Sequence, residues 1–500
     1  MPYKLLTDET FSKEMAILNK NIARLTGYVN GADITSFAQV GEYVREGIAP
    51  TLFSVGDQFE TEKVKTITAS VGNSSGITAA AVDMPKFIAK LGIVKSGVFE
   101  LTFNGAAWHT NDFDAVSLAD YGITTTGTPA ENDKIAITIT TSVLPFDVLD
   151  FDKYNPKATI KNCIVLGAHD IVEKDRIPFS ASQLLFYAQD GLPAGKYKLT
   201  LDHGGYNGST AEDGTYMFTL ANAIPAGGGF RHSKMGVYDA SLSKERVVSG
   251  TFTTYGVQPE RAEVETGIAT ALWDGSDCID LGTFADNNRA YYEEEASIVI
   301  GGTTYKGKRN VCGRNAYGTN RWRDSVYRQW LNSDAPAVAS GSSAVSNWWK
   351  PATVFDRVPG GSKLAGFLYG MDPDFVKALG EVEVKTALHR VDAIDGATFD
   401  ITYDKIFLQS QKDVFGSSDF AGVSEGEQLE YWKGVANADR IKYWNNTAAY
   451  WWLRTPTSTF AGCVRGVNAS GVLSNYGYAL SDLGFVPACC ICAKQTITNG

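Results

Sequence analysis

The sequence predicts a multidomain, mainly β protein with N-terminal helices, β-sandwich modules and a C-terminal α+β domain. Its 500 residues exceed what one hydrophobic core usually organises. The chain holds 50 glycines against 16 prolines, and 12% of its residues are aromatic while only 20% are charged. That composition is typical of short strands joined by ordered glycine turns. We therefore expect several modules in series.

Residues 1–50 predict a helical segment for attachment or oligomerisation. Apolar side chains recur at helical spacing from Phe11 to Leu25 and form a narrow seam that Gly27 closes. Two alternatives stay open for this seam. The helix packs on its own domain, or it forms a short parallel coil with one or two other copies. A second amphipathic helix is predicted over residues 35–48, just before Pro50.

The next part of the chain predicts two β modules, one inserted into the other. Runs such as "GKYKLTLDHG" and "GTYMFTLANAIPAGGGF" alternate with period two, which favours a jelly-roll-like sandwich built from residues 51–65 and 142–272. Residues 66–141 are rich in Ala, Thr, Ser and Gly and predict a small β-rich module of their own. We interpret 66–141 as an insertion, because "FSVGDQFETEKV" continues naturally into "IKNCIVLGAHDIV".

Residues 273–500 mix short helices with short strands and hold nine of the ten tryptophans. One helix is predicted in "RWRDSVYRQWLNS", capped by Asp324 or Ser325, and another in "GMDPDFVKALG", between Asp372 and Gly380. The C-terminal part predicts two strands joined at "NASG" and a last buried strand over 485–491. This region is expected to be a separate domain.

Charge and hydropathy narrow the possible partners and location. The net charge of −11 and the pI near 5.1 argue against nucleic acid, which needs a clustered basic surface. No stretch approaches eighteen apolar residues and the first residues do not form a secretion signal, so no membrane insertion is expected. Seven scattered cysteines fit folding in a reducing cytoplasm.

The motifs of common catalytic sites are missing from the sequence. Five dispersed histidines form no zinc-ligand spacing, and neither a GxSxG elbow, a P-loop nor a strand-linked GxGxxG occurs. We therefore expect no enzymatic activity, no cofactor and no metal.

Three clusters, two acidic and one of cysteines, are the candidates that could contradict this expectation. Their members are Asp274, Asp277 and Asp280; Glu293, Glu294 and Glu295; and Cys489, Cys490 and Cys492. The aspartates offer oxygen ligands for calcium, but the glycine and terminal glutamate of a calcium loop are missing and a polar turn is favoured. Adjacent glutamates on a strand point to opposite faces, so this run alone cannot be a glycosidase pair, and it is interpreted as solvated. The cysteines are predicted to be small buried side chains.

Several ordered motifs in the C-terminal region carry a family resemblance. They include "RNAYGTNRWRDSVYRQWLNSDAPA", "WWKPATVFDRVP", "DKIFLQSQKDVFG", "ADRIKYWNNTAAYWWLRTP" and "GFVPACCI". Over roughly residues 280–495 the chain resembles an uncharacterised domain of phages and prophages of gut Firmicutes. That domain is related to the C-type-lectin-like fold of formylglycine-generating enzymes and of retroelement-diversified variable proteins.

The resemblance implies a bacteriophage virion protein whose C-type-lectin-like domain binds the host cell. In relatives the variable stretch lies between "WWLR" and the last strand, which corresponds here to Thr457–Leu483. Aromatic rings and adaptable polar groups suit such a binding face. The implied ligand-binding residues are Thr457, Ser458, Thr459, Phe460, Cys463, Arg465, Asn468, Ser474, Asn475, Tyr476, Tyr478 and Asp482. Four glycines of this stretch are interpreted as permitting a loop path.

The expected partners are a glycan or protein of the bacterial surface and other virion proteins, with the chain as a homotrimer. The protein would be assembled in the host cytoplasm and located on the capsid or tail surface. Whether a retroelement diversifies the stretch stays open. The alternatives are a decoration protein without a receptor, a bacterial surface lectin, and an oxidase that uses Cys490 and Cys492. In "YWWLRTP", Trp451 and Trp452 are predicted to be the buried floor of the domain.

Overall fold

A computed structural model describes residues 36–493, with gaps. The gaps are 73–75, 93, 112–114, 203–213, 221, 232–235, 240–243, 248–252, 256–260, 264–271, 274–276, 286–294, 311–313, 315–316, 351–357 and 394–395. The described part is mainly β, as the composition predicts. The predicted seam from Phe11 to Leu25 lies outside the described residues. Within them, no helix combines the length and the apolar character needed to cross a membrane.

In the described part of the chain the helices are short, and their caps follow the sequence signals. They are α2 (Phe37–Arg45), α3 (Ala49–Leu52), α4 (Met84–Leu91), α6 (Val326–Leu331), α7 (Pro373–Ala378) and α8 (Gln411–Phe415), with the 3-10 turns η1 (Ala119–Tyr121), η3 (Trp322–Asp324), η5 (Glu430–Trp432) and η6 (Asn437–Arg440). Ser325 caps α6 and Asp372 caps α7, each through its side-chain oxygen, so both predicted helix starts are confirmed. The helix predicted over 35–48 is shorter, because Gly47 adopts a left-handed conformation just after it.

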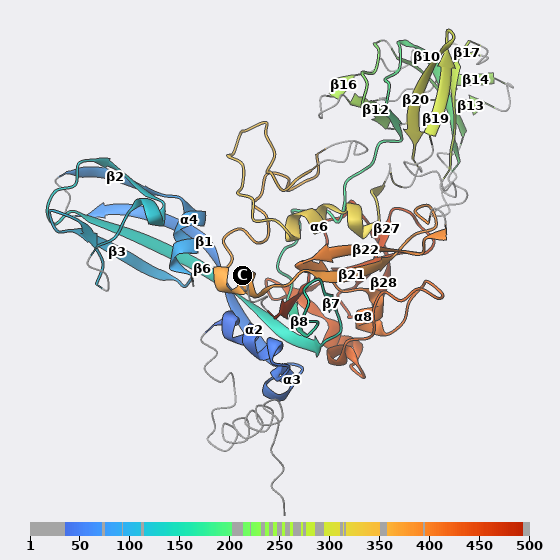
Figure 1. The fold of residues 1–500 in the computed structure, drawn as a ribbon. Coiled ribbons are helices and arrows are strands. Elements are labelled where there is room, and N and C mark those ends of the chain that lie inside the picture. The colour runs from blue at the N-terminus through green and yellow to red at the C-terminus, as the bar shows by residue number, and fades with distance from the viewer. Residues whose placement is uncertain are drawn as a thin grey trace, which may run out of the picture.

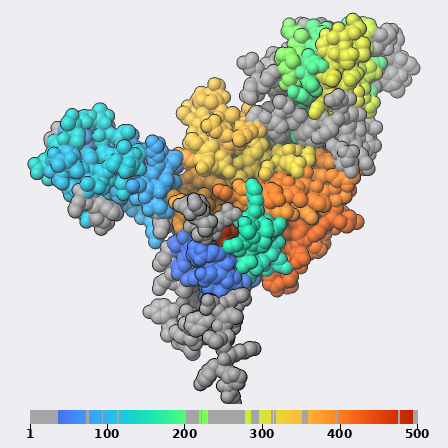
Figure 2. All heavy atoms as spheres, in the orientation of Figure 1, coloured from blue at the N-terminus to red at the C-terminus, as the bar shows by residue number. Residues whose placement is uncertain are grey.

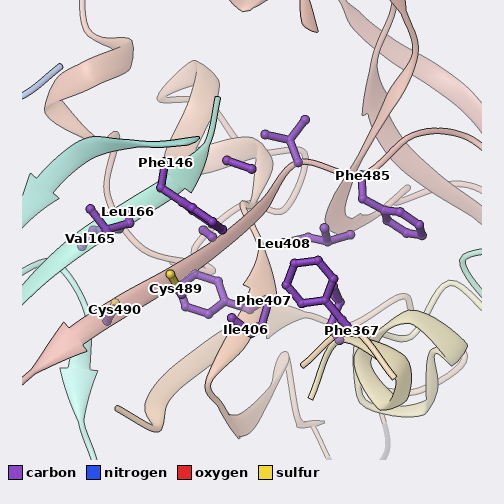
Figure 3. Packing of buried hydrophobic residues seen from close by; sticks show 14 of the residues in the cluster. Phe146, Val165, Leu166, Phe367, Ile406, Phe407, Leu408, Phe485, Cys489 and Cys490 are labelled. Carbon is purple, nitrogen blue, oxygen red and sulfur yellow. The ribbon is translucent and has the colours of Figure 1, made fainter. Parts of the chain in front are cut away.

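The central sheet joins strands that are far apart in the sequence. Its order is β23-β29-β8-β6-β3-β4, and β1 also pairs with β6. The strands are β1 (Gln58–Gly72), β3 (Gly97–Phe103), β4 (Trp108–His109), β6 (Lys134–Phe151), β8 (Cys163–Ala168), β23 (Ile406–Leu408) and β29 (Pro487–Cys492). Cys490 of β29 lies opposite Val165 of β8, and every residue of both strands is buried. Figure 3 shows Phe146, Phe407 and Cys489 within this core.

The hydrophobic core corrects the predicted domain boundaries. Residues 273–500 were expected to form a separate domain, and 142–272 to belong to the sandwich. Instead, the largest buried cluster unites residues 40–59 and 146–181 with 322–493. A second cluster, from Leu185 to Ile298, forms the core of a separate β module. The sequence did not reveal this division because strands buried on both faces are continuous apolar runs, which carry no sign of their partner.

Residues 64–139 build a module with its own hydrophobic cluster at the far end of a long two-stranded ribbon. The strands β1 and β6 run from the core into the module (Figure 1), where β2 (Ile77–Val82) and β5 (Ile123–Gly127) form a second small sheet. A cluster of its own surrounds Phe87, Leu101 and Ile135, which are completely buried. Because β6 also pairs with β8, the module is joined to the core by continuous sheet.

The β module around this second cluster contains the remaining strands of the middle region. They are β9 (Phe186–Ala188), β10 (Gly195–Asp202), β11 (Gly214–Leu220), β12 (Gly228–Arg231), β13 (Gly236–Asp239), β14 (Lys244–Val247), β15 (Thr253–Tyr255), β16 (Arg261–Glu263), β17 (Leu272–Trp273), β18 (Ile279–Ala285), β19 (Glu295–Ile300) and β20 (Thr303–Arg309). Figure 2 shows this module as a projection on one side of the molecule. The chain enters and leaves it at neighbouring points, since Asn310 donates its backbone N–H to the carbonyl of Leu185 at 2.9 Å.

Three small sheets cover the central core on the C-terminal side. They comprise β22 (Phe399–Asp404), β21 (Val382–Ala387) and β7 (Asn155–Pro156); β24 (Lys442–Trp444) and β25 (Thr447–Ala449); and β26 (Trp451–Pro456), β27 (Cys463–Val467) and β28 (Leu473–Tyr478). The turn predicted at "NASG" joins β27 to β28. The predicted binding stretch therefore includes a β-hairpin, which we call the 463–478 hairpin.

Candidate functional site

The strand β26 pairs with β27 in the same sheet as the 463–478 hairpin, and all six of its residues are buried; we call β26 with its tryptophans the floor of the hairpin. Trp451 donates its indole N–H to the carbonyl of Arg440 at 3.1 Å. The ring of Trp452 lies 5.6 Å from that of Phe179. The prediction that both tryptophans are buried scaffold is confirmed.

Arg454 fixes this floor to the surrounding core. Its guanidinium donates to the carboxylate of Asp413 at 2.8 Å, and to the carbonyls of Leu408 and Glu425 at 2.7 Å each. Tyr154 donates its hydroxyl to the same Asp413 oxygen at 2.7 Å. Both side chains of the Arg454–Asp413 pair are almost completely excluded from solvent. Such a pair tolerates little displacement, because an unpaired buried charge is costly.

The charges around Arg454 influence one another. Burial lowers the pKa of Arg454, but Asp413, Tyr154 and Glu425 outweigh burial and leave that pKa above its ordinary value. Burial raises the pKa of the Glu425 carboxyl, which Arg454 offsets only in part. Glu425 is held by the backbone N–H of Ala387 at 3.0 Å and by the hydroxyl of Thr455 at 2.8 Å. The network therefore ties loop 416–428 to β26.

Glycines of the predicted variable stretch are fixed by packing. A Cβ atom at Gly477 would lie 2.1 Å from the Trp452 ring, and one at Gly466 would lie 2.9 Å from the carbonyl of Trp451. Gly471 has φ +76°, and a Cβ atom added there would lie 1.7 Å from the carbonyl oxygen of Asn437. The interpretation that these glycines permit a loop path holds for Gly471, which lies in the turn between β27 and β28. It is wrong for Gly466 and Gly477, which lie in the strands and allow the hairpin to pack directly against Trp451 and Trp452.

Three of the predicted ligand-binding residues have internal partners instead. Thr457 is buried and donates its hydroxyl to the carbonyl of Phe460 at 2.9 Å. Cys463 is completely buried. The side chain of Asn468 accepts the backbone N–H groups of Ser470 and Val472 at 2.9 and 3.0 Å, which closes the hairpin turn. The sequence pattern missed this, because the polar residues that suit a binding face also suit turns.

Other predicted residues lie at the surface, but not all together. Tyr478 is 38% exposed, and its ring stacks on that of Tyr317 with centroids 4.2 Å apart. Thr459 is exposed, while Ser458, Phe460 and Ser474 are partly buried. Asp482 is exposed beside a different segment, since its carbonyl accepts the backbone N–H of Asp175 at 3.2 Å. The side chains of Asn475 and Tyr476 lie outside the described residues.

Arg465 links the hairpin to a neighbouring loop. It forms an ion pair with Asp419, and both side chains are mostly buried. Gln411, itself buried, donates to the other oxygen of Asp419 at 3.3 Å. The ion pair therefore holds the Arg465 side chain in place at the edge of the hairpin. It also makes loop 416–428 part of the surface around the hairpin.

A second buried network supports the segment that precedes the hairpin. Arg314 donates to Asp392 at 2.6 Å and to the carbonyl of Ala461 at 3.2 Å. Asn320 donates its amide to the carbonyls of Phe460 and Cys463 at 2.9 and 3.0 Å. Neither residue was singled out by sequence reasoning. The one available signal was their position within the motif "RNAYGTNRW".

The acidic and cysteine clusters that could be catalytic or metal-binding have other contacts in the structure. Within the described ranges, no group of three His, Cys, Asp or Glu side chains is arranged to hold a metal ion. Asp277 forms an ion pair with Lys196, and Asp280 accepts the backbone N–H of Gly282 at 2.8 Å; Asp274, Glu293 and Glu294 lie outside the described residues. Cys489, Cys490 and Cys492 are buried in β29, and burial raises the pKa of each thiol.

Comparison with known proteins points to a family of unknown function. The sequence profile of a family described as a domain of unknown function, DUF6273, matches residues 296–493. The match begins in β19 and ends just after β29, so it includes the whole 463–478 hairpin and its floor. No curated protein and no solved structure matches the chain.

Proposed function

We propose that this chain is a bacteriophage virion surface protein whose C-terminal, C-type-lectin-like domain binds a receptor on the bacterial host. The observation that carries the proposal is the construction of the 463–478 hairpin. Its backbone is held on a completely buried floor by fixed glycines, while Tyr478 and Thr459 face solvent. A rigid support under replaceable side chains suits recognition, because little conformational entropy is lost on binding.

The binding surface differs from the set predicted from sequence. Its proposed members are the exposed and partly exposed side chains around Tyr317 and Tyr478, together with Thr459, Phe460 and the fixed Arg465. Stacked tyrosines offer rigid faces for sugar rings or apolar protein surface, and their hydroxyls supply directional hydrogen bonds. Thr457, Cys463 and Asn468 are scaffold in this proposal. No metal or cofactor takes part in it.

We propose a homotrimer assembled in the host cytoplasm and carried on the capsid or tail. The support for the trimer is the apolar seam from Phe11 to Leu25, and several linked copies would multiply weak single-site binding. Sedimentation equilibrium tests the oligomeric state. A monomer that persists at micromolar concentration would contradict it.

Deleting the gene from the phage tests the function itself. Particles that lack the protein are expected to lose adsorption to host cells, and adsorption should return when the intact gene is supplied. The alternative is a decoration protein, for which adsorption would stay intact while the particles became less stable. Finding a reverse transcriptase gene beside an adenine-rich near-copy of the 457–483 coding stretch would support the further proposal that a retroelement diversifies this stretch.

A further inference from the structure

The strand β22 shows an inverted pattern of burial. Its side chains alternate between exposed and buried, and the exposed ones are Phe399, Ile401 and Tyr403, at 37%, 38% and 45% of their surface. The buried ones are Asp400, Thr402 and Asp404. A shift of one residue in the pairing with β21 would bury the apolar row and expose the carboxylates. Apolar side chains usually lie in the core, but on β22 they lie at the surface and the carboxylates are buried.

Buried ion pairs hold this register. Asp400 accepts from Arg321 at 2.6 Å and pairs with Arg323 at 3.0 Å. Asp404 accepts from Arg328 at 2.7 Å and from the indole N–H of Trp322 at 3.0 Å. Taking two carboxylates out of water requires such partners. These ion pairs lie on the opposite face of β22. They hold the register in which the three apolar side chains stay at the surface.

The neighbouring strands frame the apolar row with polar groups. On β21, Lys385 lies opposite Ile401 and Glu383 lies opposite Tyr403. The Lys385 ammonium is 4.2 Å from the ring centroid of Phe399. The Lys157 ammonium is 5.6 Å from the ring centroid of Tyr403 and also pairs with Glu381 at 3.0 Å. Two ammonium groups thus accompany two carboxylates, and this balance suits an uncharged ligand with many hydroxyl groups.

The small area of this face argues against a protein partner, and its edge argues against an added peptide strand. Six residues along β22 and β21, with two along β7, give a face about 20 Å long and at most about 14 Å wide. That is less than about 280 Å², far below the ~800 Å² that each partner contributes to a stable protein interface. The free edge of β22 is also blocked, since Arg323 donates to the carbonyl of Ile401 at 3.3 Å. An added peptide strand would have to displace this arginine.

We propose that the outer face of β22, β21 and β7 binds a linear, uncharged polysaccharide. Alternate residues on one face of a strand are about 6.6 Å apart, so Phe399 and Tyr403 present rings about 13 Å apart with Ile401 between them. Aromatic and apolar side chains pack against the apolar faces of successive sugar rings, and Lys385, Glu383 and Lys157 bond to their hydroxyl groups. This inference does not depend on receptor binding by the 463–478 hairpin.

Titration calorimetry with the full chain tests the proposal. The probes are four soluble hexasaccharides of β-linked glucose, β-linked xylose, β-linked mannose and N-acetylglucosamine. At least one is expected to bind with a dissociation constant tighter than about 10 mM. The double variant Phe399→Ser/Tyr403→Ser should weaken that binding about tenfold or more, which is the loss of a central aromatic contact. Its thermal unfolding should stay cooperative and shift only slightly, because Phe399 and Tyr403 lie outside the buried hydrophobic clusters.

A control variant distinguishes this face from other surfaces. Tyr443→Ser/Tyr450→Ser removes two tyrosines elsewhere on the molecule that are exposed to a similar degree, 43% and 44% of their surface. It should bind the hexasaccharide as the unmodified chain does. The proposal is overturned if all four sugars fail to bind, if the Phe399/Tyr403 variant binds normally, or if that variant instead dissociates an oligomer of the unmodified chain.

Discussion

Gly477 lies against the indole ring of Trp452 so closely that an added Cβ atom would meet ring atoms at 2.1 and 2.2 Å. This contact joins the 463–478 hairpin to its floor. It also separates the residues of the predicted binding stretch into two kinds. Those that face the floor determine whether the hairpin forms, and those that face solvent are free to determine what it binds.

Replacing Gly477 by alanine should destabilise the core. The added methyl group would have to displace a completely buried indole, and overpacking of this kind costs about 1–3 kcal/mol. Urea unfolding followed by tryptophan fluorescence measures the loss. Gly97→Ala is a suitable control, because no atom lies within 4 Å of its added Cβ position. Equal stability of the two variants would contradict the packing described for Gly477.

Arg454→Met should reduce stability more than the loss of any surface ion pair. The change leaves Asp413 buried without its cation, which typically costs about 3–5 kcal/mol. By comparison, Lys433→Ala breaks an exposed pair with Glu430 and should cost less than about 1 kcal/mol. Urea unfolding of both variants compares them directly. If Arg454→Met were as stable as Lys433→Ala, the buried network would not support the floor.

Stability should fall in acid partly because of His389. Burial lowers its pKa to about 3, and the nearby Arg314 adds to the effect. Its Nδ1 accepts the backbone N–H of Val391 at 3.3 Å, which requires an unprotonated nitrogen. The unfolded chain binds the proton below about pH 6.5 and the folded chain does not. The unfolding free energy therefore decreases as the pH falls from about 6.5 toward 3, and this contribution is constant above that window.

The variant His389→Gln isolates this contribution. Urea unfolding between pH 4.5 and 7.5 should show a shallower pH dependence for the variant, by up to about 1.4 kcal/mol per pH unit. Identical slopes for the two proteins would mean that His389 takes up a proton in the folded state.

Thiol reactivity tests the oxidase alternative. Cys489 and Cys490 are completely buried and burial raises the pKa of each, whereas Cys278 is partly exposed. Iodoacetamide should therefore modify Cys278 about tenfold faster or more in the folded protein, since the thiolate is the reactive form. Peptide mass spectrometry gives the order of modification. Early modification of Cys490 or Cys492 would revive the oxidase alternative.

Local structure could be predicted from the sequence where the signal was local. Ser325 and Asp372 cap helices because a side-chain oxygen next to an amphipathic run satisfies free N–H groups. The "NASG" turn and the buried Trp451 and Trp452 were likewise predicted correctly. Each of these features depends on residues within a few positions of one another.

Long-range pairing could not be predicted in the same way. The apolar strand β8 gives no indication that its neighbour β29 lies more than three hundred positions away, which is why the domain boundaries were misplaced. The burial of Arg454 and Asp400 could not be predicted either, because their partners Asp413 and Arg321 come from other segments. The glycines near Trp452 were likewise misjudged, since only the folded chain shows what each one faces.

Binding of the labelled full chain to a panel of gut Firmicutes strains tests receptor recognition by the hairpin most directly. The full chain is required, because a fragment beginning near residue 280 would leave β29 without β8. We expect Thr459→Ala/Tyr478→Ala to bind about tenfold more weakly than the unmodified chain, and Tyr443→Ala/Tyr450→Ala to bind normally. Undiminished binding by the Thr459/Tyr478 variant, or equal losses in both variants, would contradict recognition by the hairpin.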